Sequence, residues 1–193
     1  MADRETKKEG GPGMAKDTKE NIREEVQKVM DDVFEKGMLP KEAMGLTDGM
    51  VEGIYGHAYR LYNSGQYREA SQLFRLLVML DATTQKYMMG LSACYHLLGE
   101  YENALMTYSV AEILNPEDPM PCYHSSDCYA RMGEMDNALE QLQFAEEKCG
   151  ERAEYAHLKD RIHLTVDNLK KHGIKATDTD FSKNMKKGQK KQE

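Results

Sequence analysis

The chain has 193 residues, a length that suits one domain with terminal extensions. Hydrophobic residues make up 40% of it, enough for a packed core, while 31% charged residues and a mean hydropathy of −0.74 indicate extensive contact with water. No apolar run approaches the length of about 18 residues that a membrane span requires. Residues 1–9 lack the apolar stretch of a secretory signal. We therefore expect a cytosolic protein with no membrane span.

The net charge of −7 is unevenly distributed. Residues 170–193 contain eight lysines and three acidic residues, a charge of +5, so the rest of the chain carries −12. An acidic body argues against nucleic acid as the main ligand. The lysine-rich end is consistent with a solvated, disordered tail, or with a segment that touches an acidic surface, RNA or a membrane.

The residue types that carry chemistry show no arrangement typical of an enzyme or a metal site. The cysteines lack Cys-x-x-Cys spacing and histidine partners; they are Cys94, Cys122, Cys128 and Cys149. The six histidines are scattered without a nucleophile–base signature, and no phosphate-binding glycine loop is visible. We therefore expect no catalysis, no metal and no cofactor.

The N-terminal part divides into two segments. Residues 1–19 are charged, glycine-rich and without apolar periodicity, so we expect them to be disordered. Residues 20–50 contain a predicted amphipathic helix and a linker. One face of this helix is apolar, at Ile22, Val26, Val29 and Val33. This face either packs on the domain that follows or pairs with a second chain.

Between residues 51 and 152 one pattern occurs three times. Gly65, Gly99 and Gly133 are 34 residues apart, and so are Ala70, Ala104 and Ala138. A 34-residue period is the length of the tetratricopeptide (TPR) unit, two antiparallel helices joined by a tight turn. The glycine ends the first helix in the left-handed conformation, and the alanine allows close approach of the second helix. Two further sets share a position on that helix: Phe74, Tyr108 and Leu142, and Leu77, Ala111 and Ala145.

We therefore predict an all-α fold, a right-handed TPR solenoid of three 34-residue helix-turn-helix repeats at residues 51–152. The N-terminal helix precedes the repeats, and residues 153–172 form a C-terminal capping helix with a polar outer face. Residues 173–193 form the lysine-rich tail, which we expect to be disordered.

In such a solenoid the first helix of each pair lines the concave face. In the first repeat Tyr55, Tyr59 and Tyr62 lie beside a core stripe that we assign to Ile54, Ala58 and Leu61. The matching positions in the next repeats are Met89, Ala93 and His96, then Tyr123, Asp127 and Ala130. An aromatic and thioether-rich groove suits an extended or helical apolar peptide. Alternatively, the terminal helices cover these tyrosines.

The repeats also resemble a known family. The resemblance rests on Ile54–Gly65, on Leu80-Asp81 followed by Tyr87–Cys94, and on Pro121–Cys128 with its histidine, His124. Over residues 21–169 the chain is similar to the class II chaperones of bacterial type III secretion, the SycD/LcrH/IpgC-like translocator chaperones.

This resemblance implies a cytoplasmic bacterial chaperone without enzymatic activity. Such chaperones hold hydrophobic translocator proteins through a short segment in the concave groove and keep them soluble and export-competent. Together with the inner-face pattern, it gives eight candidate groove residues: Tyr55, Tyr59, Tyr62, Met89, His96, Tyr123, His124 and Asp127. It also implies a homodimer with contacts at Ile22, Val26, Val29 and Val33. The alternative is a generic TPR scaffold that joins two folded proteins.

Overall fold

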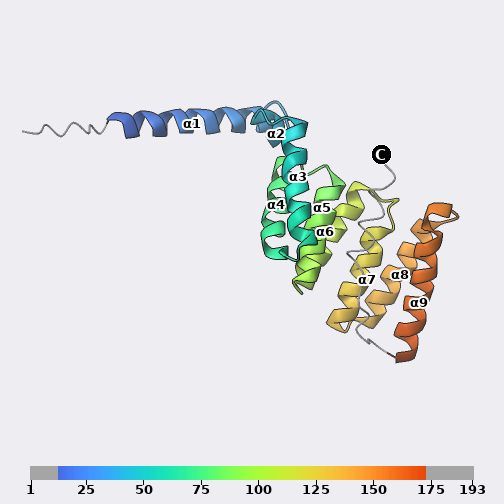
Figure 1. Ribbon diagram of the computed structural model, residues 1–193. Helices are drawn as coiled ribbons and strands as arrows, with labels where there is room; N and C mark the ends of the chain where they lie inside the picture. The colour runs from blue at the N-terminus through green and yellow to red at the C-terminus, as the bar shows by residue number, and fades with distance from the viewer. Residues whose placement is uncertain (1–12, 173–193) are drawn as a thin grey trace, which may run out of the picture. The chain divides into compact units, whose positions relative to one another are not determined.

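The computed structural model describes residues 13–172, and the side chains of residues 21–171 (Figure 1). The predictions of disorder for residues 1–12 and 173–193 concern segments outside the described residues. The chain divides into two compact units, Met1–Thr47 and Asp48–Glu193.

The first unit contains α1 (Gly13–Phe34) and α2 (Pro40–Ala43). Helix α1 begins earlier than the sequence pattern predicted, because residues 13–19 are helical rather than disordered. Lys, Ala and Glu favour a helix even where apolar periodicity is absent. On α1, Ile22, Val26, Met30 and Phe34 are exposed, while Val29 and Val33 are half-buried.

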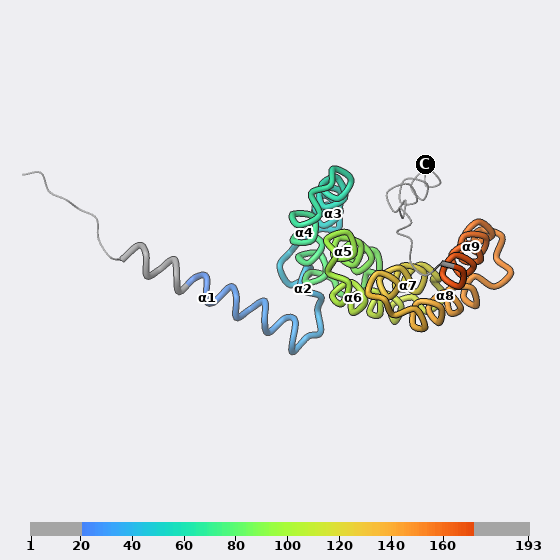
Figure 2. The backbone as a smooth tube through the Cα atoms, turned by 90° about the horizontal axis from the view of Figure 1, so that it is seen from below, coloured from blue at the N-terminus to red at the C-terminus, as the bar shows by residue number. Residues whose placement is uncertain are grey.

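The second unit contains three helix pairs and a final helix. The pairs are α3 (Asp48–Asn63) with α4 (Tyr67–Leu80), α5 (Gln85–Leu97) with α6 (Tyr101–Leu114), and α7 (Met120–Met132) with α8 (Met135–Cys149). A 3₁₀ turn (Ala153–Tyr155) leads into α9 (Ala156–His172). Each helix packs on the next, and Figure 2 shows α5 and α7 on one side of the stack with α6 and α8 on the other. The all-helical TPR prediction is confirmed.

The repeated glycine and alanine explain the shape of each pair. Gly65, Gly99 and Gly133 have φ angles of 81°, 76° and 83°, the left-handed region that a Cβ disfavours. Each glycine ends a first helix and allows the chain to reverse. The three repeated alanines are completely buried, as close approach of the second helix requires.

The second helix of each pair contributes one face to the core. The two sets predicted for this face, Phe74, Tyr108 and Leu142 and then Leu77, Ala111 and Ala145, are all buried. A separate cluster joins α7, α8 and α9 through Tyr123, Leu142, Leu158 and Ile162. Helix α9 therefore covers the apolar end of the last repeat.

All four cysteines are buried and free of disulfides. Burial raises the pKa of Cys94, Cys122 and Cys128 to about 12. Because the thiolate is the reactive form, these side chains act as small packing residues. Within the described range, no helix has the length and apolarity to cross a membrane.

Candidate functional site

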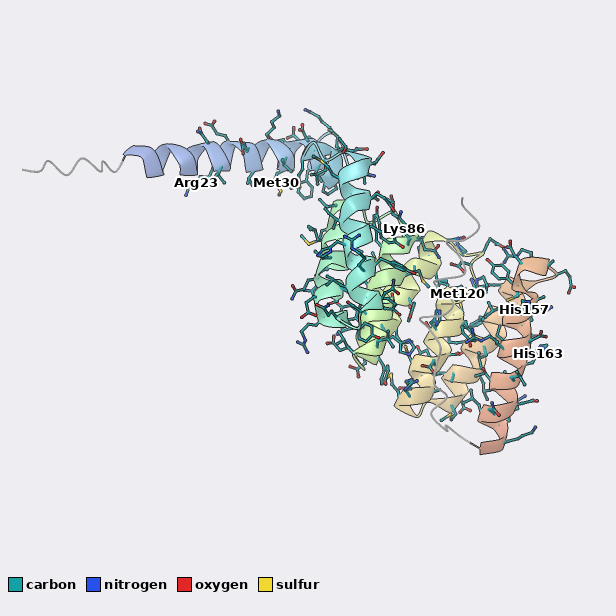
Figure 3. All side chains as sticks on the ribbon, viewed as in Figure 1. Arg23, Met30, Lys86, Met120, His157 and His163 are labelled. Carbon is teal, nitrogen blue, oxygen red and sulfur yellow. The ribbon has the colours of Figure 1, made fainter. Side chains whose placement is uncertain are left out.

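The candidate site is the face formed by the first helix of each pair, α3, α5 and α7, here called the inner face. Residues 34 apart occupy the same position on successive inner helices, so Tyr55, Met89 and Tyr123 form one row. Tyr59, Ala93 and Asp127 form a second row. Figure 3 shows Lys86 and Met120 near the N-terminal ends of α5 and α7, with His157 on α9.

An aromatic cluster occupies the α3 end of this face. The ring of Tyr55 stacks on Tyr59 with centroids 6.3 Å apart and meets Tyr87 of α5 at 5.8 Å. Its edge contacts Phe74 of α4 at 6.0 Å. Burial, followed by the nearby Tyr59, raises the pKa of Tyr55 to about 12. The phenol is therefore neutral near pH 7 and presents a half-buried apolar ring.

Tyr59 supplies a polar group inside this cluster. Its side chain is half-buried, but its hydroxyl oxygen is buried and has no hydrogen-bond partner among residues 21–171. A buried hydroxyl without a partner costs about 1–3 kcal/mol.

Tyr62, the third tyrosine, lies in the core rather than on an exposed surface. It is 3% exposed, and its ring packs 5.4 Å from that of Tyr67 on α4. The assignment of the core stripe to Ile54, Ala58 and Leu61 also needs correction, because only Ala58 of these is fully buried. The buried residues of α3 are Val51, Ala58 and Tyr62. A helix between its own partner and the next repeat buries two faces, so the tyrosine stripe itself supplies part of the core.

Three polar residues connect α5 and α7. The Nε2 atom of His96 lies 2.6 Å from Oδ2 of Asp127, and Nε of Arg131 donates to the same oxygen at 2.7 Å. Burial would raise the pKa of Asp127, but the hydrogen bonds from His96 and Arg131 outweigh it and lower the pKa. Asp127 is thus an ionised carboxylate at neutral pH that fixes α7 against α5.

His124 is buried beside this network. Its ring stacks on Tyr108, with centroids 5.7 Å apart and planes 22° apart. Burial lowers the pKa of His124 to about 3, and the neighbouring His96 adds to this effect. The imidazole is therefore neutral at physiological pH and packs as an aromatic ring.

Met89 and Tyr123 continue the row begun by Tyr55. Met89 is half-buried and packs against the cluster of Ala104, Tyr108 and Cys128. Tyr123 belongs to the core cluster of the last repeat and is only 8% exposed. Of the eight candidates, Tyr55, Tyr59, Met89 and Asp127 retain partial exposure, whereas Tyr62, His96, Tyr123 and His124 are buried.

Two cations that lie near aromatic rings of this face were not among the residues predicted from the sequence. The Nζ atom of Lys86 lies 4.5 Å from the Tyr55 centroid and 2.7 Å from Oε2 of Glu52. The guanidinium of Arg161, on α9, lies 5.4 Å from the Tyr123 ring. Lys86 and Glu52 are 34 residues apart, so a search for opposite charges at equivalent repeat positions would have found this pair.

The inner face therefore combines half-buried aromatic rings, a thioether and cations over two of the rings. In the described residues, no group of three or more His, Cys, Asp or Glu side chains is placed to hold a metal ion. Such a surface is suited to binding apolar side chains with a few directed polar contacts.

Known proteins resemble this chain in its repeats and in the sequence around them. The family model described as the tetratricopeptide repeat matches residues 51–83 and 86–118. Chaperone protein SicA of Salmonella typhimurium is 34% identical over 108 residues, which cover 55% of this chain and 66% of SicA. The matched part is therefore just under two thirds of the length of SicA.

Solved structures show the same likeness. The type III secretion translocator chaperone SycD of Yersinia enterocolitica has a TM-score of 0.63 at 26% identity, covering 66% of this chain and 95% of SycD. PcrH of Pseudomonas aeruginosa, solved with the chaperone binding region of PopD, has a TM-score of 0.63 at 27% identity, covering 65% and 95%.

The repeats and their inner face thus define an all-α TPR protein with a surface for apolar side chains. In sequence and in fold the chain is similar to these translocator chaperones of type III secretion, and its repeats match the tetratricopeptide model.

Proposed function

We propose that this chain is a cytoplasmic bacterial chaperone that holds a hydrophobic translocator protein of a type III secretion system. A short segment of the cargo lies on the inner face, and the complex keeps the cargo soluble and competent for export. The chain acts by binding, without catalysis and without a cofactor.

The observation that carries this proposal is the likeness to PcrH, which was solved with the chaperone binding region of a translocator. SycD has likewise been solved with a peptide of the translocator YopD. The half-buried rings of Tyr55 and Tyr59 provide the matching chemistry here.

Apolar burial on the inner face sets the scale of the binding free energy. A segment that is disordered before capture loses conformational entropy on binding. Burial of roughly 100 Å² of apolar surface at one anchor contributes about 2.5 kcal/mol. Two or three such anchors contribute about 5–7.5 kcal/mol, and micromolar binding corresponds to about 8.2 kcal/mol, so polar contacts and further apolar burial along the segment must supply the rest and offset these costs.

Co-expression with the translocator-like proteins of the same organism tests the proposal. We expect soluble cargo with the unaltered chain, and a fall to the level without chaperone for Tyr55→Ala combined with Met89→Ala. Ile113→Ser is the matched control, because Ile113 is 76% exposed on α6, away from the inner face. Circular dichroism would show that both variants remain helical.

A generic scaffold is the second candidate function. A scaffold joins folded proteins, so it would leave the solubility of translocator-like cargo unchanged and would bind a folded partner. Cargo that is equally soluble with and without the chain would therefore exclude the chaperone function and favour the scaffold.

A further inference from the structure

Helix α6 has two apolar faces, and the fold uses only one of them. Ala104, Tyr108 and Ala111 are completely buried in the core. Met106, Val110 and Ile113, displaced by two residues and therefore on the opposite side, are 63%, 38% and 76% exposed. A helix with a single buried face normally presents polar residues to water.

The exposed face extends across neighbouring repeats. Leu76, Val110 and Phe144 are 34 residues apart and occupy the same position on α4, α6 and α8. Met79 and Ile113 share a second repeat position. We call the set the outer band, and all its members are exposed: Leu76, Met79, Met106, Val110, Ile113 and Phe144. Apolar side chains gathered on a surface typically mark an interaction site.

The charges beside the α6 and α8 parts of the outer band are mostly acidic, whereas α4 carries Arg68, Glu69 and Arg75. Helices α6 and α8 together contain six acidic residues and one basic residue, Lys148. Lys148 is already held 3.1 Å from Glu112. A hollow of about 580 Å³ adjoins Phe144. Its lining combines acidic residues with a proline, a glycine and two cations: Glu112, Glu117, Glu147, Pro116, Gly150, Lys148 and Arg152.

We propose that the outer band is a second docking surface, and that its partner is a cationic amphipathic helix of another protein. Apolar residues at helical spacing contact Met106, Val110 and Ile113, while flanking Lys or Arg side chains meet the carboxylates of α6 and α8. The inner face lies on α3, α5 and α7, so this partner and a groove-bound segment occupy different helices.

The charge of α6 and α8 favours a cationic helix over a second copy of the chain or an anionic lipid surface. Helix α1, which also exposes an apolar face, has six acidic and four basic residues, so a second copy offers poor complementarity through it. An anionic lipid surface would be repelled by the carboxylates of α6 and α8. A basic helix gains both the apolar and the electrostatic contributions.

Methyl NMR of the full chain labelled at methionine tests the proposal. The probe is an 18-residue peptide of Leu and Lys with leucines on one helical face, and its counterpart has Glu in place of Lys. We expect the Leu/Lys peptide to shift the signals of Met79 and Met106, which are 67% and 63% exposed, and to leave buried Met88 unchanged. Ile113→Ser should weaken binding about tenfold or more, whereas Tyr55→Ala should not alter it.

Four results would overturn the proposal. The first would be equal binding of the Leu/Glu peptide, and the second would be binding of the Leu/Lys peptide to Ile113→Ser as tightly as to the unaltered chain. The third would be an oligomer in sedimentation velocity that Ile113→Ser dissociates, because the partner of the outer band would then be a second copy of the chain. The fourth would be a shift of the Met79 and Met106 methyl signals, without peptide, when the lysines at 186, 187, 190 and 191 are replaced by glutamine in the full chain. The outer band would then bind the chain's own C-terminal segment.

Discussion

A Cβ atom on Gly90 would lie 2.2 Å from Cε1 of Phe74, so α5 and α4 meet where only glycine fits. The Phe74 ring is almost completely buried, and it packs against the ring of Tyr55 on the inner face with centroids 6.0 Å apart. Gly90 therefore sets how closely the second repeat approaches the first, and through Phe74 it helps to position Tyr55.

We predict that Gly90→Ala destabilises the protein by about 1–3 kcal/mol, because the added methyl must displace an aromatic ring in a packed core. Urea unfolding followed by circular dichroism measures this change. Gly53→Ala is the matched control, since a Cβ there has no neighbour within 4 Å. Alanine replaces glycine inside α3 in that control, which should stabilise by about 0.5–1 kcal/mol. Equal effects of the two changes would show that the ring moves aside freely.

The buried His124 predicts that stability falls in acid. The folded protein lowers the pKa of His124 from 6.5 to about 3, so between these values the unfolded chain binds more protons than the folded one. Stability is therefore fully present above pH 6.5 and falls below it, by up to about 1.4 kcal/mol per pH unit. Asp127, whose pKa is also lowered, adds a loss in the same direction at lower pH.

Urea unfolding at pH 7, 6 and 5 tests this dependence. The glutamine of His124→Gln does not titrate, so the variant should show a shallower decline between pH 6.5 and pH 5 than the unaltered chain. A decline that is as steep in the variant would place the responsible proton at another residue.

The link between α5 and α7 gives a further prediction. Asp127→Asn removes the charge that His96 and Arg131 share, and charge-assisted hydrogen bonds contribute about 1.5–3 kcal/mol each. We expect a stability loss of about 2 kcal/mol at pH 7. Asp136→Asn, at an exposed position on α8, is the control and should change stability by less than about 0.5 kcal/mol. If Asp127→Asn leaves the free energy of unfolding unchanged, the hydrogen bonds of Asp127 do not stabilise the fold.

Repeat spacing was enough to predict the helix pairs, because Gly65 and Ala70 carry local requirements that recur at a fixed period. It was not enough to separate core from groove on α3. Tyr55 and Tyr62 lie on one helical face in the sequence pattern, yet Tyr62 is buried against Tyr67 while Tyr55 is half-buried. Which part of a face is covered depends on the neighbouring repeat, and a single helix's periodicity does not contain that information.

Contacts between residues far apart in sequence were also missed for a physical reason. The pairing of Gly90 with Phe74 depends on the distance between two helices, and the contact of Lys86 with Tyr55 on a side-chain rotamer. Residue type alone determines neither. The exposed apolar side of α6, in contrast, is visible in the sequence, since Met106, Val110 and Ile113 recur at i, i+4 and i+7. That stripe was not recognised because a second apolar face has no role in the TPR core.

The stripe on α1 gives the last prediction, which concerns self-association. Ile22 and Val26 are 53% and 56% exposed, and Met30 and Phe34 extend the same face. We propose that this face pairs two copies of the chain; SycD has been solved in an alternative dimer. Val26→Lys with Met30→Lys should convert a dimer to a monomer in sedimentation velocity, because buried lysines would lose their hydration. Gln27→Lys, at an exposed position beside the stripe, should leave the mass unchanged. If the double variant sediments as the unaltered chain does, this face of α1 is not a dimer contact.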